Sequence, residues 1–184
     1  MSQVKEHTDD LIPLCLKGNQ NAQMEIYNRY YKAMYNTSVR IVKDSAEAED
    51  VMQESFLSAF TKLHTFKGEV TFGSWLKRIV INNSIYHYRK NQKKNEVALD
   101  DILYKVEDND GVASDHVFTG QKAQKVMETM KRLKDNYRIS LTLYLIEGYD
   151  YEEISEIMNI SYANCRTTIS RAKESLRKKM INEN

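Results

Sequence analysis

The sequence predicts an all-α protein of two small helical domains joined by a flexible acidic linker, the second domain containing a helix-turn-helix. Its 184 residues include six glycines and one proline, a composition that disfavours turn-rich β architectures. Apolar residues recur at helical spacing over most of the chain. This periodicity is lost over residues 95–122, which contain two Lys and seven Asp or Glu. We therefore expect domains at residues 1–94 and 123–184, with residues 95–122 as the linker.

The first two helices are predicted from their end signals. Asp9 or Asp10 is expected to cap a short first helix that carries Pro13 in its first turn. Gly18-Asn19 is expected to end this helix and to cap the next, which spans about residues 20–42. An aromatic stripe recurs along the second helix at Tyr27, Tyr31 and Tyr35. We interpret this stripe as core packing.

A third and a fourth helix complete the first domain. Asp44 and Glu47 form a capping-box pattern for the third helix. Its apolar side is expected to include Val51, Phe56, Leu57 and Phe60. Residues 64–73 break the periodicity and contain two glycines, which predicts a loop. The fourth helix is expected over about residues 74–94, with Trp75 as a core residue.

The second domain resumes the helical period. Its first apolar positions are Val126, Met130, Leu133, Ile139, Leu141, Leu143 and Leu145. Gly148 is expected to end the helix that contains the last of these. Asp150 and Glu153 form a second capping-box pattern, which predicts a short helix before a turn at residues 159–161. Ser161 is expected to cap a long final helix.

The last two helices have the pattern of a helix-turn-helix. The final helix is expected to bury Cys165, Ile169, Ala172 and Leu176. Its exposed face then carries Arg166, Thr167, Ser170 and Arg171. Such a helix fits the major groove of DNA, where Arg pairs with guanine and Ser or Thr reaches base edges or phosphates. An ordinary helical hairpin with a solvated polar face has the same pattern.

Three segments carry a family resemblance. They are residues 48–56 (AEDVMQESF), residues 75–79 (WLKRI) with Asn82 and Arg89-Lys90 after them, and residues 147–157 (EGYDYEEISEI) with Ile160-Ser161 after them. In this order and spacing they resemble the extracytoplasmic-function sigma factors of the sigma-70 family. The three segments look like the family's helix for binding the RNA polymerase clamp, its −10-reading helix and its −35-reading helix-turn-helix. The resemblance covers nearly the whole chain and implies a non-enzymatic protein that directs polymerase to promoters.

The resemblance implies a polymerase-binding site on the third helix. Asp50, Gln53 and Glu54 lie at i, i+3 and i+4, so they share one helical face. An acidic, amide-bearing stripe suits a basic helical partner. On composition alone, a solvated face fits these residues better, and the assignment to polymerase comes from the resemblance.

The resemblance also implies where promoter DNA binds. Single-stranded −10 DNA would contact Phe66, Lys67, Lys77, Arg78, Asn82, Arg89 and Lys90. The loop at residues 65–72 would form a pocket for a flipped base, because a base must be unstacked before it is read as a single strand. The −35 duplex would contact the four polar residues of the final helix. Simple exposure to solvent is the alternative for the polar residues of the fourth helix.

The implied partners are core RNA polymerase, at its clamp and flap regions, promoter DNA, and an anti-sigma factor of the kind that the family usually anchors in the membrane. The acidic linker has two interpretations, an occupant of channels that normally hold RNA and a mere spacer. No cofactor or metal is expected: the four His residues form no pair at i, i+4, and Cys15 and Cys165 match no metal spacing.

Two other classes of protein are weighed against this reading. A self-sufficient helix-turn-helix regulator usually binds DNA as a dimer, and the chain shows no heptad seam for dimerisation. An enzyme is disfavoured because no Gly-rich phosphate loop or nucleophile motif occurs. We expect a cytoplasmic protein with reduced cysteines, since acidic residues precede the first short apolar run.

Overall fold

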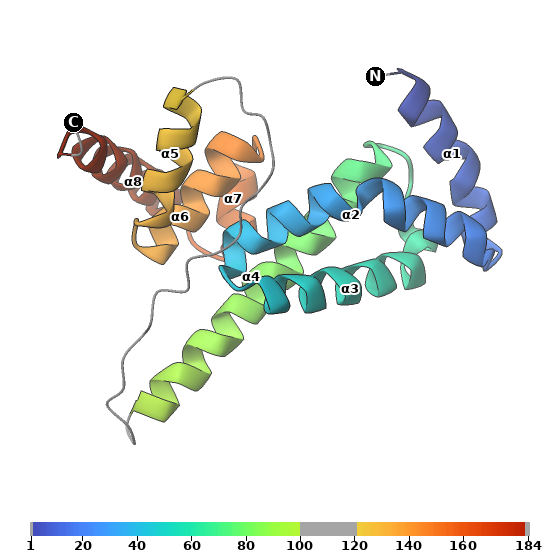
Figure 1. The fold of residues 1–184 in the computed structure, drawn as a ribbon, viewed down its shortest axis with the longest axis horizontal. Coiled ribbons are helices and arrows are strands. Elements are labelled where there is room, and N and C mark those ends of the chain that lie inside the picture. Colours follow the sequence, from blue (N-terminus) through green and yellow to red (C-terminus); the bar gives the residue numbers. More distant parts are fainter. Residues whose placement is uncertain (1, 100–120, 183–184) are drawn as a thin grey trace. The chain divides into compact units, whose positions relative to one another are not determined.

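The computed structural model describes residues 2–99 and 121–182 (Figure 1). Within each of these two ranges the chain forms helices joined by short turns and loops, and no strand occurs there. The chain divides into two compact units, Met1–Tyr104 and Lys105–Asn184. The predicted flexible linker falls largely on residues 100–120, outside the described residues. Among the helices described, none is long and apolar enough to cross a membrane.

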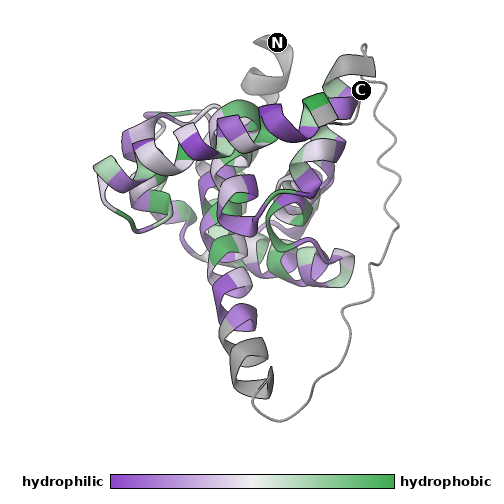
Figure 2. Cartoon of the chain, turned by 90° about the vertical axis from the view of Figure 1, so that its left-hand side faces the viewer, coloured by the Kyte–Doolittle hydropathy of each residue, from purple (hydrophilic) through white to green (hydrophobic). Residues whose placement is uncertain are grey.

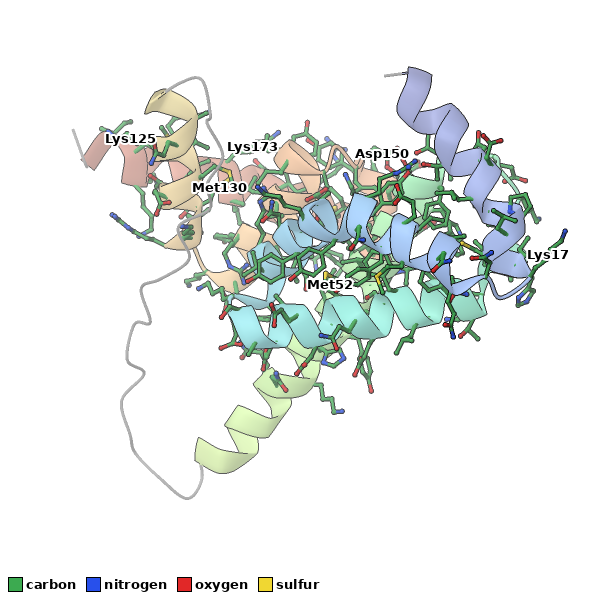
Figure 3. The ribbon with its side chains drawn as sticks, turned by 45° about the vertical axis from the view of Figure 1, so that its right-hand side comes forward. Lys17, Met52, Lys125, Met130, Asp150 and Lys173 are labelled. Carbon is green, nitrogen blue, oxygen red and sulfur yellow. The ribbon has the colours of Figure 1, made fainter. Side chains whose placement is uncertain are left out.

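The first unit is a bundle in which three long helices pack on one another and a fourth, α1, packs on α2. Its elements are α1 (Ser2–Leu16), α2 (Gln20–Val42), α3 (Ser45–Thr61), the short 3₁₀ helix η1 (Leu63–Thr65) and α4 (Phe72–Leu99). Each long helix buries one stripe, and the stripes meet in a core that includes Ile26, Met34, Met52, Phe56, Leu76 and Val80. Met52 lies inside this bundle in Figure 3. The predicted four helices are therefore present.

Two of the expected caps in this unit are confirmed. Gly18 adopts a φ of 78° after α1, a left-handed conformation that costs glycine little. The Asn19 side chain accepts a hydrogen bond from the backbone N–H of Ala22 at 3.0 Å. At the start of α3, Asp44 accepts from the N–H of Glu47 at 2.8 Å. These side chains satisfy N–H groups that have no partner within the first turn of a helix.

The expected start of the first helix at Asp9 or Asp10 is wrong. Helix α1 begins at Ser2, so Pro13 lies in its interior, on the exposed side. Proline costs the helix one hydrogen bond. Packing of α1 before and after Pro13 offsets this loss, because Thr8 is 2% exposed and Cys15 is 4% exposed. Arg29 of α2 also donates a hydrogen bond to the Thr8 hydroxyl at 3.1 Å.

Two further details of the first unit differ from expectation. Helix α4 begins at Phe72, which is buried, and not at residue 74, and it continues to Leu99. A Cβ on Gly73 would lie 2.9 Å from the ring of Tyr30, so glycine lets α4 approach α2 closely here. Leu57 does not belong to the apolar side of α3, since it is 68% exposed.

The second unit is built from α5 (Gln121–Lys131), α6 (Asp135–Leu141), the π-helix η2 (Thr142–Ile146), α7 (Tyr151–Ile157) and α8 (Tyr162–Asn182). The long α8 packs against α5, α6 and α7. Figure 2 shows that hydrophobic and hydrophilic residues alternate along the helices, as one-sided burial requires. The largest fully buried side chains of this unit are Leu141, Leu143, Ile154 and Ile169.

The helix-turn-helix signals of the second unit are confirmed. Asp150 accepts from the N–H of Glu153 at 2.8 Å, and Glu153 accepts from the N–H of Asp150 at 3.0 Å, so the capping box is complete. Asn159 has a φ of 49°, the left-handed conformation expected in the turn. Ser161 accepts from the N–H of Asn164 at 3.2 Å and caps α8.

The capping box generates a stability prediction. Asp150→Ala should lower the free energy of unfolding of the second unit by about 1 kcal/mol, because the backbone N–H of Glu153 loses its side-chain acceptor at the start of α7. Asp150→Asn is the matched control, since Asn caps helices as well as Asp does. Urea unfolding followed by circular dichroism measures the loss, while the fluorescence of Trp75, the one tryptophan, reports on the first unit. Identical curves for the two variants, or a loss that appears in the Trp75 signal, would contradict the assignment.

Candidate functional site

The predicted acidic face of α3 is present. Asp50, Gln53 and Glu54 are all exposed on one side of the helix, opposite the buried residues that face the core. Leu57, three residues after Glu54, lies on the same side and is 68% exposed. Sequence reasoning placed Leu57 in the core, although its spacing of four from Gln53 indicates the acidic side. The face therefore combines acidic and amide groups with one apolar side chain.

A polar seam, which we define as the side-chain contacts of Asn83, His87 and Asn91 with α3, joins α4 to α3. Asn83 donates to the Ser55 hydroxyl at 3.0 Å, and His87 Nε2 lies 2.8 Å from a carboxylate oxygen of Glu54. Asn91 donates to the Glu47 carboxylate. The three α4 residues are spaced by four, so they follow one edge of the helix. The seam aligns residues 83–91 of α4 with residues 47–55 of α3.

A second polar contact joins α4 to α2 within the core. The Ser84 hydroxyl lies 3.1 Å from the Ser38 hydroxyl, and both residues are fully buried. Ser84 also donates to the carbonyl of Val80 at 2.7 Å. Buried hydroxyls are costly unless they are paired, so these contacts specify how α2 and α4 pack.

The predicted −10 residues on α4 do not all share a face. Asn82, Arg89 and Lys90 are exposed, and Arg78 is half-buried on the same side as Asn82 and Arg89. Lys77 is half-buried and lies about 140° around the helix from Asn82, at 100° per residue. The structure thus separates Lys77 from the other basic residues and places it toward the buried side.

Tyr86 lies on this outer side of α4 and was missed by sequence reasoning. It is 63% exposed and stands four residues after Asn82 and three before Arg89. Its spacing within the set Asn82, Tyr86 and Arg89 was the available signal. An exposed aromatic ring between basic residues is the combination that stacks single-stranded bases and tracks their phosphates.

The two residues of the loop before α4 that were predicted to contact −10 DNA differ in their exposure to solvent. Phe66 is half-buried, with its ring centroid 5.8 Å from that of Phe72 and 5.4 Å from that of Trp75. Lys67 is exposed. The chain turns at Gly68, which has a φ of 75°. Phe66 therefore fixes the loop against α4, and Lys67 is the side chain of this pair that the loop presents to solvent.

The pattern of exposed and buried residues on α8 agrees with expectation. Arg166, Thr167, Ser170 and Arg171 are all exposed, whereas Cys165, Ile169, Ala172 and Leu176 are buried. Arg166 and Arg171 stand about 140° apart, one near each edge of the polar face. Thr167 donates its hydroxyl proton to the carbonyl of Ala163 at 2.9 Å, which leaves its oxygen available as an acceptor. Burial raises the pKa of the Cys165 thiol, as expected of a reduced core cysteine.

A tyrosine cluster at the start of the helix-turn-helix was not predicted. Tyr144 and Tyr151 are stacked with centroids 5.3 Å apart, and Tyr162 meets Tyr151 edge-on at 6.4 Å. Lys173 Nζ lies 4.0 Å from the centre of the Tyr144 ring, and Figure 3 labels this lysine. A hydrogen bond with Tyr151, followed by the interaction with Lys173, lowers the pKa of Tyr144. The cluster ties η2, α7 and α8 together, since its residues come from all three elements.

Comparison with known protein families matches both units. Residues 26–94 match Sigma-70 region 2, and residues 123–176 match Sigma-70, region 4. The chain is 33% identical over 159 residues to the ECF RNA polymerase sigma factor SigM of Bacillus subtilis, covering 83% of this chain and 91% of SigM. It is 32% identical over 173 residues to the ECF RNA polymerase sigma factor SigW of the same organism, covering 89% and 91% of the two chains.

Two solved structures share the fold. The sigma factor RpoE of Bartonella quintana, solved with the anti-sigma factor NepR, superposes with a TM-score of 0.59 at 17% identity, covering 88% of this chain and 98% of that one. CnrH, solved with the cytosolic domain of CnrY, gives a TM-score of 0.56 at 21% identity, covering 95% and 97%.

The packing of Phe66 against Phe72 and Trp75 gives a prediction about its structural role. Phe66→Ala should destabilise the first unit by about 2 kcal/mol, roughly half the cost of truncating a fully buried Phe. Lys67→Ala, the neighbouring exposed residue, should change stability by less than about 0.5 kcal/mol. Urea unfolding followed by the fluorescence of Trp75, which contacts Phe66, measures both. Equal stability of the two variants would show that Phe66 does not hold the loop.

Proposed function

Because the chain belongs to the sigma-70 family, as an extracytoplasmic-function RNA polymerase sigma factor, we propose a division of its work between the two units. Residues 1–94 bind the polymerase clamp and capture the melted −10 strand, and residues 123–184 read the −35 element as duplex. The observation that carries this proposal is the match of residues 26–94 to region 2 and of residues 123–176 to region 4. Sigma factors are not enzymes, so the chemistry stays with polymerase.

The clamp-binding role falls to the exposed face of α3. Asp50, Gln53 and Glu54 offer carboxylate and amide groups to a basic partner, and Leu57 adds an apolar contact among them. An apolar anchor surrounded by polar groups is a common design of protein interfaces. Opposite charges across the interface speed association and fix its register more than they raise affinity.

The outer side of α4 is the site proposed for −10 recognition. Arg78 and Arg89 carry positive charge for the phosphates, Asn82 offers an amide for a base edge, and Tyr86 offers a ring for stacking. Lys67 extends this basic surface into the preceding loop. We leave Lys77 out of the contact set because it lies toward the buried side of the helix. The polar seam then transmits the position of the clamp to the captured strand through packed side chains.

Duplex reading is assigned to α8. Arg166 and Arg171 are suited to guanine edges or phosphates, and Thr167 and Ser170 to shorter-range hydrogen bonds. The second domain as a whole is only mildly basic. Weak phosphate contacts alone give weak binding, so the unit relies on polymerase, held at its clamp and flap regions, for affinity.

An anti-sigma factor is the remaining partner. Support comes from RpoE of Bartonella quintana, whose solved complex contains the anti-sigma factor NepR. Membrane anchoring of the anti-sigma factor is the usual arrangement in the family. The sigma factor itself acts where polymerase acts, in the cytoplasm.

Charge reversal on α3 tests the clamp assignment. Asp50→Lys with Glu54→Lys should abolish co-purification with core polymerase, because like charges would meet at the interface and each contact would lose about 1 kcal/mol or more. Asp9→Lys with Asp10→Lys makes the same change of charge on exposed positions of α1 and should leave binding intact. Circular dichroism should be native for both double variants. Retained polymerase binding by the α3 variant would overturn the clamp assignment, and no binding by wild type would overturn the proposed function.

The assignment of α8 is tested by promoter selection. Arg166→Ala and Arg171→Ala should each reduce −35-dependent transcription, because each loses about 1–3 kcal/mol of binding free energy to the −35 element. Loss of a base-reading Arg should relax specificity at one base pair, whereas loss of a phosphate-binding Arg should weaken all sites alike. Lys178→Ala is the control, since Lys178 lies farther along the same helix and pairs with Glu174 at 2.7 Å. Transcription from a library randomised at −35 measures both effects. Wild-type promoter selection by both Arg variants would contradict the proposal that α8 reads the −35 element.

A further inference from the structure

Tyr162, the first residue of α8, is an aromatic side chain that stands open to solvent, with an exposed fraction of 46%. It precedes Arg166 by four residues, so the two side chains lie about 40° apart around the helix and one turn apart along it. Ser170 continues the same row one turn later and is also exposed. Tyr162 therefore begins the row of side chains that is proposed to enter the major groove.

Contacts within the second unit support the Tyr162 ring. Its centroid lies 6.4 Å from that of Tyr151 in α7, and the planes of the two rings are 84° apart. Tyr151 is stacked on Tyr144 of η2, and Lys173 Nζ lies 4.0 Å from the centre of the Tyr144 ring. These three supporting residues are all half-buried. Because the ring is held by packed neighbours, a contact with DNA would cost it little side-chain entropy.

The chemistry of the Tyr162 ring suits one feature of the major groove. Thymine presents its C5-methyl group there, and apolar side chains recognise thymine through contact with this methyl. The N-terminal residues of a recognition helix are those that reach base edges. An arginine recognises guanine or a phosphate, so the ring supplies a contact of a different kind at the end of the row.

We propose that Tyr162 determines specificity at one position of the −35 element by placing its ring against the methyl group of a thymine, which presupposes that α8 reads duplex as proposed above. Four residues of helix advance about 6 Å, and base pairs are stacked about 3.4 Å apart. The thymine, on either strand, therefore lies within about two base pairs of the position that Arg166 contacts. The Tyr162 hydroxyl has no part in this recognition.

Replacement of thymine by uracil tests the proposal, because uracil lacks only the methyl group. The −35 element that wild type selects from the randomised library is prepared with uracil in place of each thymine in turn, on both strands. Transcription is then measured with core polymerase and the full-length chain. At one position near that of Arg166, wild type should lose about fourfold in transcription, the effect of one methyl group. Tyr162→Ala should transcribe the thymine and uracil templates equally at that position.

Two variants separate the ring contact from other effects of the substitution. Tyr162→Phe keeps the ring and should retain the wild-type ratio between the thymine and uracil templates. Asn164→Ala changes an exposed residue about 160° around α8 from Tyr162 and should retain the ratio as well. The wild-type measurement needs no substitution, so it decides the question even if Tyr162→Ala fails to fold.

The inference is overturned if wild type selects no thymine near the Arg166 position, or if uracil at every such thymine leaves wild-type transcription unchanged. A Tyr162→Ala variant that keeps the wild-type ratio, or a Tyr162→Phe variant that loses it, would also overturn it. In each of these cases the proposed reading of the −35 element by α8 still stands. Absence of any −35 preference in wild type would instead overturn the proposed function, and the role of Tyr162 with it.

Discussion

The register of α4 against α3 is the constraint on which the first unit depends. Apolar packing brings the helices together, but it tolerates sliding. The part-buried contact of Asn83 with Ser55 favours one alignment, because a shifted register would deprive the Asn83 amide of this partner, whereas the exposed contact of His87 with Glu54 adds little. In that alignment the acidic face of α3 and the outer side of α4 belong to one rigid body. On the proposed assignment, a clamp bound to α3 then sets the position of a DNA strand on α4.

The helix-turn-helix of the second unit, which we propose reads duplex DNA, depends on its caps and its turn. The capping box of Asp150 and Glu153 starts α7, and the left-handed Asn159 turns the chain into α8. The angle between the short α7 and the long α8 decides how α8 can enter a major groove. The two units thus solve different problems. We propose that the first holds an unstacked strand on a fixed helical surface and that the second presents the side chains of one helix to intact base pairs.

One-sided burial explains how much the sequence could predict. The acidic face of α3 and the reading face of α8 follow from residue spacing alone, as does the core position of Cys165. Tertiary contacts decide the rest. Helix α1 passes through Pro13 because Thr8 and Cys15 are buried on either side of it. The packing of Phe66 against Trp75, and the stacking of tyrosines from three elements, join residues whose proximity no local pattern encodes.

The central claim is that the chain gives core polymerase its choice of promoters and has no regulatory activity without it. Mapping of transcription start sites on genomic DNA, with purified core polymerase in the presence and absence of the chain, tests this claim most directly. We expect discrete start sites that share −35 and −10 sequences and that appear only when both proteins are present. Unchanged start sites on addition of the chain, or tight and specific binding of the same DNA by the chain alone, would contradict it.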